Sequence, residues 1–151
     1  MTLVPEWAPN IHPLLVHFPI ALLIAAAAVD VVGWVFRRSR VVRQTATLLY
    51  VLGTGAAVVT YFTGRAASQA VWLPGMAQAV VGEHWNWAFR TVWFFGIVTV
   101  LRLVLITRRD RGPAVTAAFA LAGLLGIGLL VETGDRGGRL VYEHGVGTVS
   151  R

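Results

Sequence analysis

The stretch that decides the fold reads PLLVHFPIALLIAAAAVDVVGWVF and covers residues 13–36, with Asp30 as its only formally charged residue. An α-helix needs about 20 apolar residues to cross the hydrocarbon core of a bilayer, and this stretch exceeds that length. It lacks the polar face at helical spacing that a surface helix of a soluble bundle shows. The stretch therefore predicts a transmembrane helix.

Three more stretches have the same character, and they cover residues 44–64, 85–107 and 112–132. The composition agrees, because 56% of the residues are hydrophobic and only 13% are charged, whereas soluble domains carry about 25% charged residues. We therefore expect an all-α, polytopic membrane protein. A four-helix transmembrane bundle is expected in residues 1–132. A short extended C-terminal tail, residues 133–151, is expected to pack on or near this bundle.

The arginines set the expected orientation in the membrane. All 13 basic residues are Arg, and two short connections hold seven of them: Arg37, Arg38, Arg40, Arg43, Arg108, Arg109 and Arg111. The positive-inside rule places such connections in the cytoplasm, so both termini and the central connection are expected outside. We interpret the net charge of +6 as anchoring in the bacterial inner membrane rather than as nucleic-acid binding.

Histidine supplies the candidate ligands, because cysteine is absent and thiolate sites and covalent c-type haem are thereby excluded. In the expected topology all four histidines fall on the outer side: His12, His17, His84 and His144. Neutral imidazole is a good ligand of iron, copper and zinc, and two imidazoles on facing helices can hold a haem. The other polar side chains expected at this depth are Tyr61, Arg90 and Glu132.

Three interpretations of this polar layer remain open. In the first, haem b or a transition metal binds to the histidines, with His17 and His84 as the preferred pair of ligands. In the second, the histidines and Glu132 carry protons for a proton-coupled or quinone-type redox site. In the third, the imidazoles are structural and hydrogen-bond to backbone carbonyls. Under the first interpretation the remaining candidate site residues are His12, His144, Arg90, Glu132 and Tyr61.

Pro19 lies inside the first predicted helix. Its ring nitrogen has no hydrogen to donate to the carbonyl of Leu15, so the helix is expected to kink there. A kink at this point also leaves a carbonyl without its helical partner close to His17.

A second polar pair is expected toward the inner side of the membrane. Asp30 precedes Arg37, and Arg102 precedes Arg108, by similar numbers of residues, which puts both about 10 Å from the inner edge. A lone charge at this depth is expensive, and pairing lowers the cost. We therefore predict an ion pair between Asp30 and Arg102 that joins the first and third helices. We interpret this pair as a packing contact rather than as part of a proton path.

The two ends of the chain resemble a known family. The segments that carry the resemblance are HPLLVHFP at residues 12–19, Asp30 later in that helix, and GRLVYEHGVG at residues 138–147. In this order they resemble the bacterial membrane family catalogued as domain of unknown function 2231. The likeness covers nearly the whole chain and is weakest in the middle third, around His84.

The resemblance implies a four-helix integral membrane domain. Relatives occur alone or joined to Rieske-type or cytochrome c-type modules, which implies a redox partner that must here be a separate chain. On this basis we expect binding of haem b or a transition metal in support of electron transfer. The alternative is a non-catalytic anchor or assembly module for separate redox proteins. The chain on its own is not expected to be an enzyme, and a homo-oligomer is left open.

Overall fold

A computed structural model describes residues 10–36, 39–71, 73–105 and 112–148. In these residues the helices are, in chain order, α1 His12–Leu15, α2 His17–Val35, α3 Arg40–Ala70, α4 Gly75–Leu105 and α5 Pro113–Tyr142. Because α1 and α2 are one predicted helix divided at Val16, they form four long rods. Each rod is long and apolar enough to cross a membrane, which confirms the predicted fold class.

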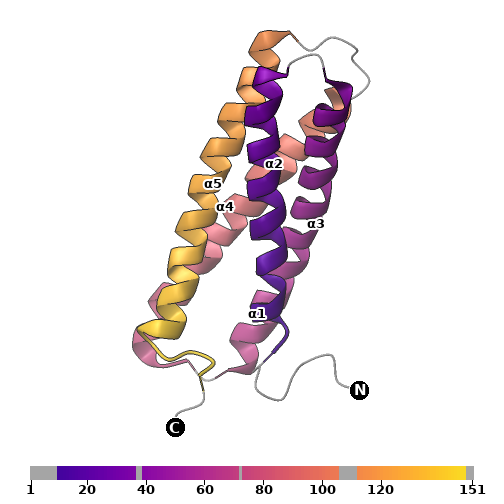
Figure 1. The fold of residues 1–151 in the computed structure, drawn as a ribbon. Coiled ribbons are helices and arrows are strands. Elements are labelled where there is room, and N and C mark those ends of the chain that lie inside the picture. The colour runs from indigo at the N-terminus through magenta and orange to yellow at the C-terminus, as the bar shows by residue number, and fades with distance from the viewer. Residues whose placement is uncertain (1–9, 37–38, 72, 106–111, 149–151) are drawn as a thin grey trace, which may run out of the picture.

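The four rods run alternately up and down and pack as a bundle (Figure 1). Each helix packs against its neighbour in the chain, and α5 closes the bundle against α2. The diagonal pairs, α2 with α4 and α3 with α5, have no close backbone contact within the described ranges. We call the end that carries α1 and the turn between α3 and α4 the histidine end. The opposite end, where α3 and α5 begin, is the arginine end.

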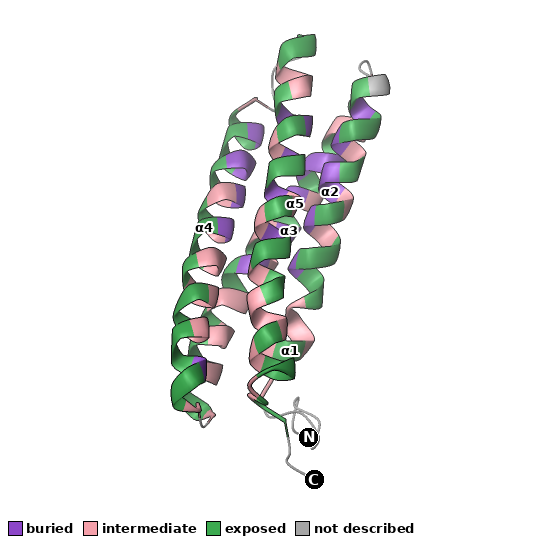
Figure 2. Cartoon of the chain, turned by 90° about the vertical axis from the view of Figure 1, so that its left-hand side faces the viewer, coloured by how far each residue is buried: buried purple, intermediate pink, exposed green. Residues whose placement is uncertain are grey.

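The buried core of the bundle combines large side chains, such as Tyr50 and Phe95, with small residues at close helix contacts. Figure 2 shows the buried residues as stripes on the inner faces of the helices, with exposed residues outside. Leu23 is fully buried against Gly53, where an added Cβ would lie 2.8 Å from the Leu23 side chain. Small residues allow such close approach where the bilayer supplies no hydrophobic drive between helices.

The helices at the histidine end are longer than the sequence predicts. Helix α3 continues to Ala70 and α4 begins at Gly75, so the predicted connection of residues 65–84 shrinks to residues 71–74. Helix α5 continues to Tyr142, where an extended tail from Thr133 onward was expected. Only residues 143–148 of the described tail leave the helix.

Helix α5 extends beyond its apolar stretch because of salt bridges and packing, which hydropathy does not reflect. Salt bridges one turn apart, Glu132 with Arg136 and Arg139 with Glu143, support the polar end of the helix. Packing against α4 also continues there, because Arg136 reaches Glu83 at 3.5 Å. These contacts hold residues 133–142 in the helix, where the sequence predicted an extended tail.

The break at Val16 follows from Pro19. Val16 keeps helical dihedral angles, with φ −59° and ψ −27°, so the chain bends there without leaving the helical region. The carbonyl of Leu15, which Pro19 cannot reach with a hydrogen bond, instead accepts one from the Thr60 hydroxyl of α3 at 3.4 Å. The expected free carbonyl therefore has a partner on the neighbouring helix.

Candidate functional site

His12 opens α1 and docks this short helix on the end of α3. Its backbone N–H donates to the Asn10 side-chain oxygen at 3.0 Å, which satisfies one free donor of the helix start. Its ring Nδ1 lies 3.3 Å from the Thr63 hydroxyl oxygen. The ring rests on Gly64, where an added Cβ would lie 2.8 Å from Cε1. A larger residue at position 64 would thus displace the imidazole.

His84 has an equivalent arrangement on the other side of the bundle. It lies on α4, and its Nδ1 is 3.0 Å from the backbone carbonyl oxygen of Thr133 on α5. Its Cε1 faces Gly137, where an added Cβ would lie 3.2 Å away. Both histidines are half-buried. Each therefore joins two helices through Nδ1 and rests its ring on a glycine.

The hydrogen bond to Thr133 fixes the tautomer of the neutral His84 ring. A carbonyl oxygen only accepts, so the Nδ1 of His84 must carry the hydrogen and the lone pair is on Nε2. The contact of His12 with the Thr63 hydroxyl allows either tautomer, because this hydroxyl also lies 3.0 Å from the Thr60 carbonyl oxygen and can donate or accept. Neither Nε2 has a hydrogen-bond partner in the part of the chain that the structure describes.

The two half-buried imidazoles lie at the same end of the bundle. His12 belongs to the pair of helices α1 and α3, and His84 to the pair α4 and α5, which lie on opposite sides of this end in Figure 1. We call His12 and His84 the histidine pair.

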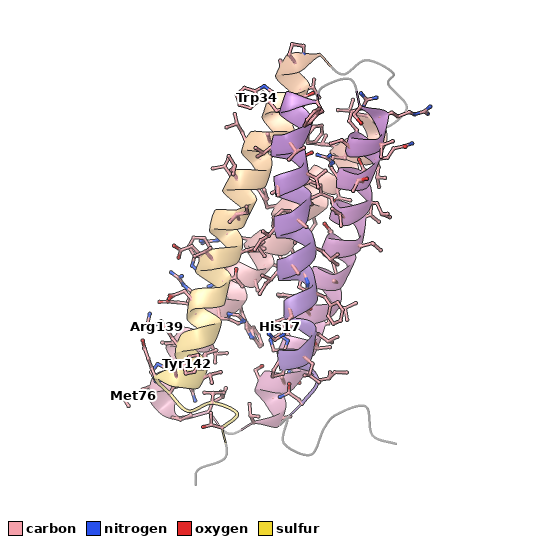
Figure 3. All side chains as sticks on the ribbon, in the orientation of Figure 1. His17, Trp34, Met76, Arg139 and Tyr142 are labelled. Carbon is pink, nitrogen blue, oxygen red and sulfur yellow. The ribbon has the colours of Figure 1, made fainter. Side chains whose placement is uncertain are left out.

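His12 has a setting like that of His84, whereas the sequence favours His17 as the partner of His84. His17 is exposed on α2, near the histidine end, where Figure 3 labels it. His144 is half-buried in the turn after α5, and its backbone N–H donates to the carbonyl of Arg139 at 3.2 Å. Its Nε2 is buried and has no hydrogen-bond partner among the described residues.

The other predicted site residues contact different neighbours. The Arg90 guanidinium lies 5.0 Å from the ring centroid of Trp87, and Glu132 pairs with Arg136. Tyr61 packs its ring against Phe62 and Phe89. In the described ranges none of Arg90, Glu132 and Tyr61 hydrogen-bonds to a histidine.

The described residues contain no group of three or more His, Asp or Glu side chains that could hold a metal ion. The histidine pair thus offers two nitrogen ligands and no third. A bare zinc or copper ion usually takes three or four protein ligands.

The predicted ion pair between Asp30 and Arg102 is present in the structure. Arg102 donates from both terminal nitrogens to the two carboxylate oxygens of Asp30, at 2.7 and 2.8 Å. The guanidinium is 1% exposed and lies 4.6 Å from the ring centroids of both Tyr50 and Phe119. The aromatic faces and the carboxylate together surround the buried cation.

The residues that hold the histidine pair could not be picked out from the sequence: Thr63, Gly64, Thr133 and Gly137. Hydroxyl pairs between helices were missed as well, since Thr54 meets Thr99 at 2.8 Å and Thr91 meets Thr133 at 2.9 Å. The available signal was a Thr or Gly near the end of an apolar stretch. That signal cannot tell which helix the side chain faces.

Comparison with known proteins identifies the family. The family model described as "Predicted membrane protein (DUF2231)" matches residues 8–150. The chain therefore belongs to this family of membrane proteins, as the resemblance of its two ends implied. No curated protein and no solved structure matches the chain.

Proposed function

We propose that this multi-pass membrane protein binds haem b between His12 and His84 and thereby supports electron transfer. The observation that carries the proposal is that each ring of the histidine pair is held through its Nδ1. Each ring has its Nδ1 held by a hydrogen bond and its Nε2 left without a partner in the described part of the chain. Histidines that ligate metals usually have this arrangement.

The number of ligands favours haem over a bare ion. Haem iron needs only two axial ligands from the protein, because the porphyrin supplies the others. The histidine pair supplies two imidazoles, and the described residues hold no larger group of ligands. The absence of cysteine leaves non-covalent haem b as the type that fits. When bound, a haem supplies one-electron chemistry.

The protein's own residues orient the two ligands. The hydrogen bonds of Nδ1 with Thr63 and Thr133 fix each ring, and the one donated to the Thr133 carbonyl makes the Nε2 of His84 a stronger base. Gly64 and Gly137 let the helix backbones approach the rings. Arg90 has no carboxylate partner among the described residues, and we assign it to a haem propionate.

A visible spectrum tests the proposal. The protein is purified in mild detergent, incubated with haem, separated from excess haem, and recorded oxidised and reduced. We expect a Soret band that is lost in His12→Ala and in His84→Ala. His17→Ala is the matched control, because this exposed histidine lies on the same predicted helix as His12, and it should keep the band. A colourless wild-type protein, or loss of the band only in His17→Ala, would contradict the proposal.

A second candidate function rests on the fact that His12 and His84 each join two helices of the bundle. Each of them already links two helices without any ligand, as a structural residue does. In this case the bundle is a non-catalytic anchor or assembly module for a separate Rieske-type or cytochrome c-type protein. It predicts a colourless protein in which both histidine variants lower the thermal stability.

A further inference from the structure

A row of aromatic side chains follows the seam between α3 and α4 at the histidine end. Tyr61 and Phe89 lie 6.4 Å apart between ring centroids, and Phe89 and Trp93 lie 6.0 Å apart. Trp85 precedes Phe89 by one helical turn and contacts Arg65 of α3, whose guanidinium carbon is 5.1 Å from the Trp85 ring centroid. We call Tyr61, Trp85, Phe89 and Trp93 the aromatic ladder.

Phe89 and Trp93, the ladder residues farther from the histidine end, face outward from the bundle. Phe89 is 51% and Trp93 59% exposed. From Trp85 to Trp93 the helix rises about 12 Å. A ladder of this length reaches from the headgroup region, which tryptophan prefers, into the hydrocarbon.

The positive charge of Arg65 lies beside Trp85, and no carboxylate of the described residues pairs with it. At the histidine end Arg136 pairs with Glu83 and Glu132, and Arg139 pairs with Glu143. Arg65 is exposed, and no carboxylate pairs with it within the described ranges. The ring of Trp85 holds its guanidinium at the start of the ladder. The surface thus combines the Arg65 cation, held against Trp85, with the exposed aromatic side chains of Phe89 and Trp93 farther along α4.

We propose that Arg65 and the aromatic ladder bind an anionic phospholipid. The Arg65 guanidinium pairs with the lipid phosphate, because its planar set of N–H donors matches the phosphate oxygens. One acyl chain lies along Phe89 and Trp93. A lipid with a choline headgroup fits less well, because its own cation offsets the phosphate charge.

A second copy of the chain is the less suitable occupant of this surface. A two-fold interface places the same patch of both copies face to face. Two Arg65 side chains without carboxylate partners would then approach each other. The lipid site is also separate from the proposed haem site, since it lies on the outer seam of α3 and α4 and uses neither histidine.

Native mass spectrometry tests the lipid site. The full-length protein in mild detergent is titrated with phosphatidylglycerol and, separately, with phosphatidylcholine of the same acyl chains. We expect one phosphatidylglycerol to be retained preferentially, and Arg65→Gln to weaken its binding about fivefold, the effect of one arginine near a charged lipid surface. Arg139→Gln is the matched control, because Arg139 lies at the same end but is paired with Glu143, and it should bind like wild type.

Three results would overturn the proposal. They are equal retention of the two lipids, equal weakening by Arg65→Gln and Arg139→Gln, and a dimer whose formation excludes lipid. If Arg65→Gln does not fold, wild type alone decides the question. Its preference for phosphatidylglycerol must then fall as salt is raised, because salt screens an exposed ion pair.

Discussion

Asp30 of α2 and Arg102 of α4 form a two-pronged ion pair across the diagonal of the bundle. These two helices have no close backbone contact in the described ranges, so the long arginine side chain bridges them. The pair is buried, and replacing one partner would leave the other as an uncompensated charge in a low-dielectric interior. The bridge therefore fixes the depth of α2 relative to α4.

Asp30→Asn should lower the free energy of unfolding by about 3–5 kcal/mol, because it leaves Arg102 charged and without its carboxylate partner. Thermal unfolding in detergent, followed by circular dichroism, measures the effect. The double variant Asp30→Leu with Arg102→Leu is the control, since removing both charges should cost far less than removing one. Unchanged stability of Asp30→Asn would show that the pair does not support the fold.

Thr60→Val should lower the stability by about 1 kcal/mol, because it removes the hydrogen bond to the Leu15 carbonyl that Pro19 leaves unpaired. Thr45→Val is the matched control on the same helix, where the threonine is exposed. Thermal unfolding of the two variants makes the comparison. A smaller loss in Thr60→Val than in Thr45→Val would mean that this carbonyl does not depend on Thr60.

Gly64→Ala should lower the stability by about 1–3 kcal/mol, because the new methyl group would overlap the ring of His12. The same variant should weaken the proposed Soret band by turning the ligand away. Gly55→Ala is its control, since an added Cβ at this position of α3 meets no atom within 4 Å. Gly55→Ala should instead raise the stability by up to about 1 kcal/mol through helix propensity. Equal melting temperatures in the two variants would contradict the packing of His12 on Gly64.

Much of the fold could be predicted because membrane insertion depends on local properties of the chain. Length and hydropathy identified the four helices, and the missing hydrogen of Pro19 located the bend between α1 and α2. The depth of Asp30 and Arg102 in the membrane could be estimated by counting residues along the two helices. Because an unpaired charge at that depth is costly, the two opposite charges were expected to pair. The helix ends at Ala70 and Tyr142 could not be predicted in this way, because α3 and α5 continue beyond their apolar stretches, and salt bridges that hydropathy does not reflect support the end of α5.

The sequence by itself determined that this protein is a bundle of four membrane-spanning helices, with a buried ion pair and histidines near one end. The tertiary structure decided which histidines are buried against neighbouring helices. His12 and His17 lie five residues apart, about 140° around a helix, so both cannot face the same interior space. Rotation of a helix about its axis is set by packing against its neighbours. Here His12 packs on Thr63 and Gly64 of α3 and is half-buried, whereas His17 is exposed.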